Sequence, residues 1–172
     1  EQYLYLAVDK NGKFIFINDS GKIILNAPFD DVAPFSENYA GIKIGNKWGF
    51  INRKGKIIIN PQFDLVLPFT QQRALVIIDK KMGFIDLEGK FIINPQFDDA
   101  ASFSEGLAAV KTNNKWGFID LEGNYAINPQ FDFAFPFCEG LTLVIIEKKA
   151  GYADKNGKLV IAPQFENATV FK

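Results

Sequence analysis

The sequence predicts an all-β protein made of tandem 34-residue antiparallel units. One phase of the repeat carries Trp48, Met82, Trp116 and Ala150, which follow one another at this constant 34-residue spacing. The runs between turn residues are rich in β-branched and aromatic side chains, and none sustains the 3.6-residue spacing of a helix. Each unit also contains one Asn or Asp that is followed three residues later by Gly. Such a regular repeat indicates that one supersecondary unit stacks on copies of itself.

Five units fill the chain without insertion or deletion. Counted from the phase of Ser36, they span residues 2–35, 36–69, 70–103, 104–137 and 138–171. We therefore treat residues 1–172 as a single repeat array. Loops of ordinary domains vary in length, so a fixed loop length indicates that each loop packs against its neighbours.

Three strands are expected in each unit, and the fourth unit shows them best. They are expected near residues 107–111, 115–120 and 124–128. Between the second and third strands, an Asn or Asp side chain can accept a local backbone N–H, and the Gly can take a positive φ. Together these features predict a hairpin. The five turns begin at Asn18, Asn52, Asp86, Asp120 and Asp154.

The third strand is expected to end at Pro129 and its counterparts, because proline donates no ladder hydrogen bond. Beyond it, Phe131, Ala134 and Phe137 recur at a spacing of three. This spacing predicts a single 3₁₀-like turn or a coiled loop. We expect these side chains to plug the gap between successive units.

The Trp-Gly pair is interpreted as a packing feature. Gly inside a strand is unfavourable unless something approaches closely, and we expect an aromatic ring from an adjacent strand or unit to lie over Gly117. Trp48 and Trp116 are assigned to the core. The alternative is an exposed platform that stacks on sugars, but such a platform would not readily accept Met82 or Ala150 at the same phase.

The chain resembles the WG-repeat (KWG-repeat) family of bacterial proteins. The matching stretches are Lys-Trp-Gly-Phe-Ile at 47–51 and 115–119, and Pro-Gln-Phe-Asp at 61–64, 95–98 and 129–132. The resemblance covers essentially the whole chain and implies a β-rich interaction module without general catalytic residues. The first unit departs from the pattern, with Ala27-Pro28 in place of Pro-Gln, and so does the last.

A second, 68-residue period divides the units into two alternating types. Units three and five share Leu-Val-Ile-Ile at 75–78 and 143–146, whereas units two and four carry Lys43 and Lys111 in this region. Five units cannot alternate around a closed ring without a mismatch, so the expected architecture is an open, solenoid-like stack. The alternative is a five-bladed β-propeller, although blades usually have four strands and a 34-residue unit is short for four.

The apolar side chains of the 68-residue period are the candidate interaction surface, because a contiguous exposed apolar patch marks an interface. The candidate residues are Leu65, Leu67, Ile77, Phe133, Phe135 and Ile145. Two alternatives stay open. One is that these side chains belong to the internal core, and the other is that the period records a duplication.

Charged residues also recur at fixed phase. One ladder consists of Lys13, Lys47, Lys81, Lys115 and Lys149; another consists of Asp30, Asp64, Asp98, Asp132 and Glu166; a third consists of Glu37, Glu105 and Glu139. We interpret them as a lysine–carboxylate network or as caps on backbone N–H groups. The alternative is calcium bound by Asp98 and Asp99 or by Asp30 and Asp31, although the motif supplies few of the oxygens that calcium needs.

Composition excludes several classes of function. The net charge is −1 with both signs interspersed, which argues against nucleic acid as a partner. No apolar run approaches the roughly 20 residues of a membrane span. The chain has no His, and Cys138 occupies a phase held elsewhere by Ser or Thr, so we expect a small turn residue rather than a nucleophile.

The expected function is therefore a non-catalytic scaffold that binds another protein, without cofactor or metal. The alternative is a carbohydrate- or cell-surface-binding module that uses aromatic rings. The chain starts at Glu1 rather than Met, so a leader or a larger parent protein is possible. Both a cytoplasmic and an exported location stay open.

Overall fold

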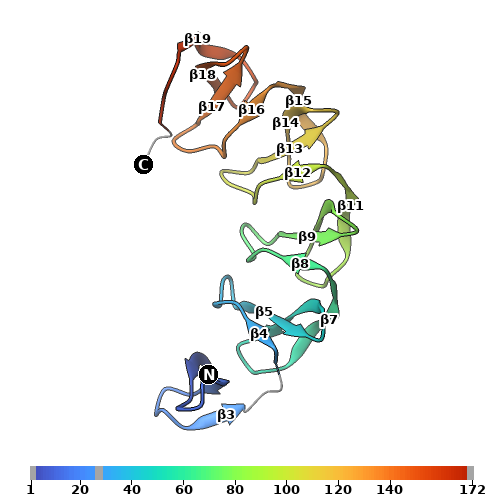
Figure 1. The fold of residues 1–172 in the computed structure, drawn as a ribbon, viewed down its shortest axis with the longest axis vertical. Helices are drawn as coiled ribbons and strands as arrows, with labels where there is room; N and C mark the ends of the chain where they lie inside the picture. Colours follow the sequence, from blue (N-terminus) through green and yellow to red (C-terminus); the bar gives the residue numbers. More distant parts are fainter. Residues whose placement is uncertain (1–2, 26–28, 170–172) are drawn as a thin grey trace. The chain divides into compact units, whose positions relative to one another are not determined.

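A computed structural model describes residues 3–25 and 29–169 (Figure 1). Within these ranges the regular secondary structure is all β, arranged in five antiparallel sheets, none of which closes into a barrel. The predicted class and the tandem antiparallel units are thus confirmed. Gln2 and Phe171, at the outer ends of the expected units, lie outside the described residues, and so do Ala27 and Pro28, where the first unit departs from the pattern.

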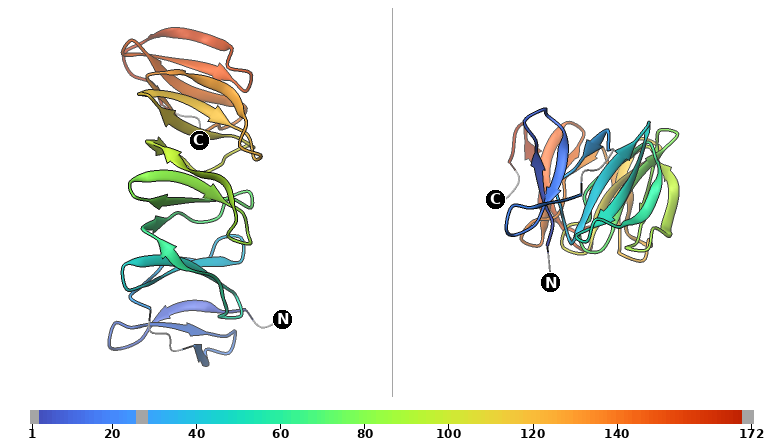
Figure 2. Two further views of the ribbon diagram at one scale, coloured as in Figure 1. Left: turned by 90° about the vertical axis from the view of Figure 1, so that its right-hand side faces the viewer. Right: turned by 90° about the horizontal axis from the view of Figure 1, so that it is seen from below.

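Each sheet is a meander whose strands follow one another in sequence order, as Figure 2 shows. Sheet 1 contains β1 (Tyr5–Val8), β2 (Phe14–Ile17) and β3 (Ile23–Leu25). Sheet 2 contains β4 (Asp31–Val32), β5 (Tyr39–Ile44), β6 (Lys47–Asn52) and β7 (Ile57–Phe63). Sheet 3 contains β8 (Leu65–Val66), β9 (Ala74–Ile78), β10 (Lys81–Ile85) and β11 (Phe91–Phe97). Sheet 4 contains β12 (Asp99–Ala100), β13 (Ala108–Thr112), β14 (Lys115–Ile119) and β15 (Tyr125–Phe131). Sheet 5 contains β16 (Phe133–Ala134), β17 (Leu141–Ile146), β18 (Lys149–Asp154) and β19 (Leu159–Phe165).

The chain divides into two compact units, which we describe separately. Unit 1 comprises Glu1–Asp79 and Ile85–Lys90, and unit 2 comprises Lys80–Phe84 and Phe91–Lys172.

Four of the sheets contain a short strand that the sequence did not predict. The segment around Val66 was expected to be a single 3₁₀-like turn or a coiled loop, but it forms β8, whose Leu65 is the register partner of Ile77. Backbone bonds from Asp64 N to Ile77 O (2.8 Å) and from Leu67 N to Leu75 O (2.9 Å) flank the pair. The expectation that a 34-residue unit is too short for four strands was therefore wrong, because an edge strand can be as short as a residue pair.

The Asx turns are confirmed in all five sheets. At Asn52, the side-chain oxygen accepts the N–H groups of Lys54 and Lys56 at 2.9 and 3.1 Å. Gly55 donates to the backbone oxygen of Asn52 at 2.9 Å and has a φ of 74°. The same two side-chain bonds to residues two and four positions on occur at Asp9, Asn18, Asp86, Asp120 and Asp154.

The glycine of the Trp-Gly pair lies against a neighbouring backbone, not against an aromatic ring. A Cβ atom at Gly117 would stand 2.5 Å from the Ile127 oxygen and 2.7 Å from the Pro129 nitrogen. Pro129 lies inside β15 rather than at its end, because the strand bulges there. Trp116 pairs with Phe131 and Phe118 pairs with Ile127, so β15 inserts extra residues between the two pairs. Residues in a bulge are not paired across the ladder, so a proline, which has no N–H group, costs no hydrogen bond there.

Two side chains of each bulged strand face the next sheet. In unit 1, Ile59 and Phe63 join the buried cluster that also contains Val66 and Phe69 of the following segment. The Phe50 and Phe69 rings lie 4.8 Å apart. The expectation that these aromatics fill the gap between successive repeats is confirmed, although the local structure differs from the one predicted.

A second inter-sheet contact recurs at every step. The turn glycine of one sheet covers an apolar side chain on the last strand of the sheet before it. The pairs are Gly55 with Leu25 and Gly89 with Ile59 in unit 1, and Gly123 with Ile93 and Gly157 with Ile127 in unit 2. A Cβ on these glycines would come within 3.2 Å or less of that side chain, so the turn fits closely onto its neighbour.

We predict that Gly117→Ala destabilises the protein by about 3 kcal/mol, because the added methyl group overlaps backbone atoms that cannot turn aside. The matched control is Gly106→Ala, in the turn that precedes β13. Gly106 has a φ of 85°, and nothing lies within 4 Å of its Cβ position, so only the left-handed backbone is penalised, by about 1 kcal/mol. Urea unfolding measures both. Equal losses for the two variants would contradict the close approach at Gly117.

Two-residue hairpin turns force some ordinary residues into the left-handed region. Glu147 and Lys148 have φ values of 49° and 66° between the paired residues Ile146 and Lys149. A positive φ at both central positions defines a type I′ turn, which favours Asn and Gly.

We predict that Lys148→Gly stabilises the protein by about 1 kcal/mol, since Gly takes a positive φ without the penalty of a side chain. Asn114→Gly, at the equivalent turn of sheet 4, should gain less, because Asn already tolerates a φ of 63° there. The midpoints of urea unfolding compare the two. A destabilised Lys148→Gly variant would show that the lysine side chain contributes more than its backbone strain costs.

Candidate interaction surface

The candidate residues lie on two short edge strands and the strands beside them. In unit 1, Leu65 of β8 pairs across the sheet with Ile77 of β9. In unit 2, Phe133 of β16 pairs in the same way with Ile145 of β17. Leu65 and Phe133 are 42% and 41% exposed, and both isoleucines are half-buried. Sheets 3 and 5 thus each present an apolar cross-strand pair at the edge.

The other two four-stranded sheets carry a charged pair at the same position of the register. Asp31 pairs with Lys43 in sheet 2, and Asp99 pairs with Lys111 in sheet 4. Opposite charges on facing residues stabilise an antiparallel pair, as two apolar side chains do. The 68-residue period therefore appears in the structure as alternating apolar and charged edge pairs.

Aromatic packing accounts for part of this alternation. In unit 2, the Trp116 ring of sheet 4 lies 5.1 Å from the Phe133 ring on the edge of sheet 5. Phe133 also makes an edge contact with Phe135 at 5.0 Å. Where Met82 replaces the tryptophan, the next sheet begins with Asp99 instead. An apolar edge residue thus follows a tryptophan, and a charged one follows the smaller thioether.

The prediction that the tryptophans pack in the core is confirmed for Trp116, which is 4% exposed. Trp48 is half-buried and packs against the core cluster of unit 1. Neither ring lies flat on the surface as a freely exposed stacking platform.

The remaining candidates are half-buried. Leu67 and Phe135 each follow the edge strand and continue its backbone pairing. The Phe135 N–H donates a hydrogen bond to the Leu143 oxygen at 3.0 Å. The Thr142 hydroxyl donates to the Phe135 oxygen at 2.6 Å. The structure therefore brings the six residues together as two groups of three, one in each unit. The core alternative fails for Leu65 and Phe133, which remain exposed.

The lysine–carboxylate network is confirmed. Lys47 pairs with Asp64 in unit 1; Lys81 pairs with Asp98 and Lys115 with Asp132 in unit 2. The second oxygen of Asp64 accepts the Asp79 N–H at 2.8 Å. Each carboxylate thereby ties a lysine of one sheet to a hairpin turn of the next.

These contacts change the acidity of the carboxyl groups. The hydrogen bond from the Lys115 ammonium, followed by the Glu147 N–H, holds the pKa of Asp132 below its usual value. Lys47 and the Asp79 N–H lower the pKa of Asp64 in the same way, with Lys47 the larger cause. Lys81 is the main cause of the lowered pKa of Asp98.

The glutamate ladder caps turns of the following repeat. The Glu37 carboxylate accepts the N–H groups of Gln71 and Gln72 at 2.7 and 2.8 Å. Glu105 accepts the Gly140 N–H at 3.0 Å and forms an ion pair with Lys155 at 3.2 Å.

The acidic pairs proposed for calcium are engaged otherwise. Asp98 binds Lys81, and Asp99 accepts the Ala100 N–H at 2.9 Å. Asp30 accepts the Gly45 N–H at 2.6 Å. Over residues 3–25 and 29–169, no group of three or more His, Cys, Asp or Glu side chains is placed to hold a metal ion. Cys138 occupies a tight turn, as expected, with its N–H donating to Leu141 O at 2.9 Å.

One apolar ladder was missed by the sequence analysis. A large side chain at the start of the last strand of each sheet is exposed. These residues are Ile23, Ile57, Phe91, Tyr125 and Leu159. The available signal was a large side chain two residues after every turn glycine.

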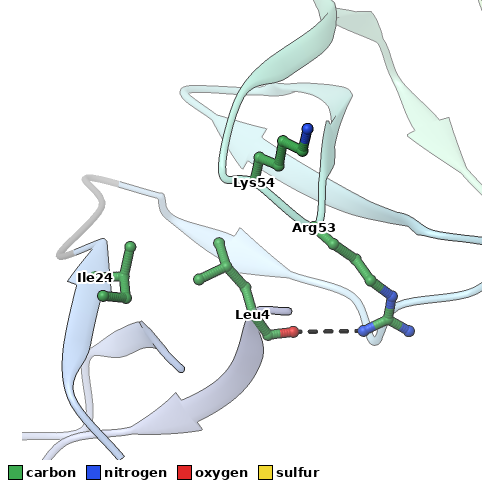
Figure 3. A pocket seen from close by; sticks show the side chains of 4 residues that line it. All are labelled: Leu4, Ile24, Arg53 and Lys54. Atoms are coloured by element: carbon green, nitrogen blue, oxygen red, sulfur yellow. Dashed lines mark hydrogen bonds between the residues drawn. The ribbon is translucent and has the colours of Figure 1, made fainter. Parts of the chain in front are cut away.

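A small pocket lies in unit 1 between sheet 1 and the turn of sheet 2 (Figure 3). Leu4 and Ile24 form its apolar side, and Arg53 and Lys54 contribute the cationic one. Arg53 is already engaged, because it donates to the Leu4 oxygen at 3.4 Å and lies over the Phe35 ring at 4.6 Å.

The fold and the repeated contacts define a tandem β-repeat protein. Five stretches match the WG containing repeat, at residues 16–48, 48–81, 82–116, 116–149 and 151–172. The chain belongs to this WG-repeat family. A search of curated proteins finds no match. The described part of the chain contains no helix long and apolar enough to cross a membrane.

The solved structures that match this chain do so at low sequence identity. One is KlHsv2 with loop 6CD replaced by a Gly-Ser linker, at a TM-score of 0.54 and 10% identity, covering 93% of this chain and 66% of that chain. Another is the WD40 domain of SCAP from fission yeast, at a TM-score of 0.48 and 10% identity, covering 95% and 56%. This chain spans just under two thirds of the KlHsv2 chain, and the likeness concerns the fold alone.

We predict that acid removes the contribution of the lysine–aspartate network. A carboxyl group whose folded pKa is lowered stabilises the fold above its unfolded pKa of about 3.9, and this contribution is lost as pH falls through the folded pKa. Urea midpoints between pH 6 and 2 should therefore fall less steeply in the variant carrying Lys47→Met, Lys81→Met and Lys115→Met. An identical pH dependence in both proteins would contradict a stabilising role for these pairs.

Proposed function

We propose that this protein is a non-catalytic scaffold that binds another protein through its apolar edge pairs. The observation that carries the proposal is the exposure of Leu65 and Phe133 on two-residue edge strands, each beside a half-buried isoleucine. Aromatic side chains such as Phe are enriched at interface cores, and apolar side chains that stay exposed in a contiguous patch mark an interface.

The charged edge pairs support this assignment. The fold accepts Asp31 with Lys43 and Asp99 with Lys111 at the same register position. A fold that tolerates either kind of pair does not itself require an exposed phenylalanine. The apolar pairs therefore stand out as the surface that a partner would cover.

The absence of catalysis is part of the proposal. The sequence contains no His. The described carboxyl groups with altered acidity, such as Asp120 and Asp132, have lowered pKa values caused by structural hydrogen bonds. A general acid or base that works near neutral pH needs a shift in the opposite direction.

Carbohydrate binding is the weaker alternative. It needs exposed rings, and the burial of Trp116 removes one of the two tryptophans from consideration. Phe133 and Phe135 remain as rings that a sugar could contact, so the experiment below includes this outcome.

The test is photo-crosslinking in the source cells with benzoylphenylalanine placed at position 65 or 133. We predict one protein adduct shared by both positions. Phe91 and Tyr125 are comparably exposed on other strands, and the probe at these control positions should not give that adduct. Equal labelling at all four positions, or a glycan adduct alone, would contradict protein binding at the edge pairs.

Affinity measurements with the captured partner complete the test. Phe133→Asp should weaken binding at least tenfold, because a charge replaces a desolvated aromatic anchor. The matched control is Tyr125→Asp, which should bind as the parent does. Thermal unfolding of both variants must show that the fold persists, since Phe133 also contacts Trp116.

A further inference from the structure

The charged edge pairs do more than place opposite charges beside each other. In sheet 2, Asp31 is the register partner of Lys43, and its carboxylate also accepts the N–H of the next residue, Val32, at 2.8 Å. In sheet 4 the carboxylate of Asp99 accepts the Ala100 N–H in the same way, at 2.9 Å. The aspartate of a charged edge pair therefore caps one backbone N–H of the edge strand.

The N–H group at this position points away from the rest of the sheet. Val66 of β8 is the register partner of Val76, and the flanking bond runs from Leu67 N to Leu75 O at 2.9 Å. In an antiparallel ladder this pattern identifies a non-hydrogen-bonded pair, whose own N–H and C=O groups face outward. The same pattern places the N–H and C=O of Ala134 on the outer side of β16.

In the sheets with apolar edge pairs this cap is missing. Leu65 and Phe133 stand where the charged sheets have aspartate, and their side chains contain no hydrogen-bond acceptor. No side chain of the described residues accepts the N–H of Val66 or Ala134. We call β8 and β16 the open edges, and β4 and β12 the capped edges. Each compact unit contains one of each kind.

The outward N–H can be reached from solvent. Strands β8 and β16 are the outermost strands of their sheets in the part of the chain that the structure describes. At a capped edge the group that reaches the N–H is the side chain of Asp31, an exposed residue. A carbonyl oxygen of another protein can approach Val66 along the same path. Val66 is itself 8% exposed, and a buried N–H without an acceptor is unfavourable, so this group favours a partner.

We propose that each open edge pairs with an extended segment of the partner protein, which adds a strand beside β8 or β16. This inference rests on the proposed function and names the form of the partner. One residue of the segment accepts the Val66 N–H through its C=O and donates its own N–H to the Val66 C=O. In strand addition of this kind main-chain bonds give affinity and side chains give specificity. An apolar side chain of the segment lies beside Leu65, or beside Phe133 at the second edge, as cross-strand neighbours do.

The pairing is short. Outward N–H groups alternate along an edge strand, so the next one would belong to Pro68 in sheet 3 and to Pro136 in sheet 5. Proline has no N–H group. The segment therefore needs a residue other than proline at the pairing position and an apolar residue next to it, but no long strand. An edge that ends in proline also disfavours pairing between copies of this chain.

Amide hydrogen exchange, followed residue by residue by NMR, tests the open edges in the free chain. The N–H groups of Val66 and Ala134 should exchange at least about tenfold faster than the capped N–H groups of Val32 and Ala100. The partner captured by photo-crosslinking should slow exchange at the open edges and leave the capped edges unchanged. Equal exchange at open and capped edges of the free chain would overturn the proposal.

Proline substitutions then remove the N–H groups, with the captured partner as the probe. The variant carrying Val66→Pro and Ala134→Pro should bind about tenfold more weakly, because a partner carbonyl loses its donor. Its matched control carries Val32→Pro and Ala100→Pro at the capped edges and should bind as the parent does. An edge strand accepts proline where the nitrogen faces outward, and circular dichroism must show both variants folded. If the open-edge variant does not fold, slowed exchange at Val66 on binding decides.

The outcomes separate this inference from the proposed function. Weaker binding of the open-edge variant alone supports strand addition. Unchanged binding of that variant, together with weak binding of Phe133→Asp, would overturn strand addition and leave side-chain docking at the edge pairs. Unchanged binding of both, or no captured protein, would overturn the proposed function as well. Sedimentation equilibrium of the chain alone covers one other occupant: a dimer that the open-edge prolines dissociate would identify a second copy of this chain and overturn a separate partner.

Discussion

In every four-stranded sheet two backbones approach closely at one glycine of the second long strand. These glycines are Gly49, Gly83, Gly117 and Gly151. At Gly117 the oxygen of Ile127 occupies the space where a side chain would begin. This approach occurs beside the bulge of β15, and Ile127 and Phe131 of that strand lie in one buried cluster. Both side chains then reach the next sheet.

The inter-sheet step combines an apolar centre with polar ties at its margin. The phenylalanines and the turn glycine exclude water, and the Lys–Asp pairs and Glu caps link one repeat to the turns of the next. Exposed ion pairs contribute little individually. Their regular spacing suits them to setting the register of neighbouring repeats, whereas the apolar contacts supply most of the stability.

The edge strands carry different residues on one shared framework. Trp116 packs against Phe133, and the phenylalanine ring remains partly open to solvent. At the equivalent position, Asp99 meets Lys111 instead. The framework tolerates this exchange because an edge strand has a neighbour on one side only. Substitutions there change the surface, whereas the bulge, the turn and the buried phenylalanines between the sheets stay the same.

Local chemistry written in the sequence determined the repeat length, the Asx turns and the three longer strands. A turn such as Asn52 to Gly55 involves residues close in sequence, so its bonds follow from residue type alone. The fourth strand was not predictable in this way, because Leu65 pairs with Ile77 in a sheet that crosses the limits of the 34-residue unit. Only the tertiary structure decided what faces Gly117 and which apolar residues stay exposed. Burial depends on the neighbouring sheet, as at Ile127, which the turn glycine Gly157 of the following sheet covers.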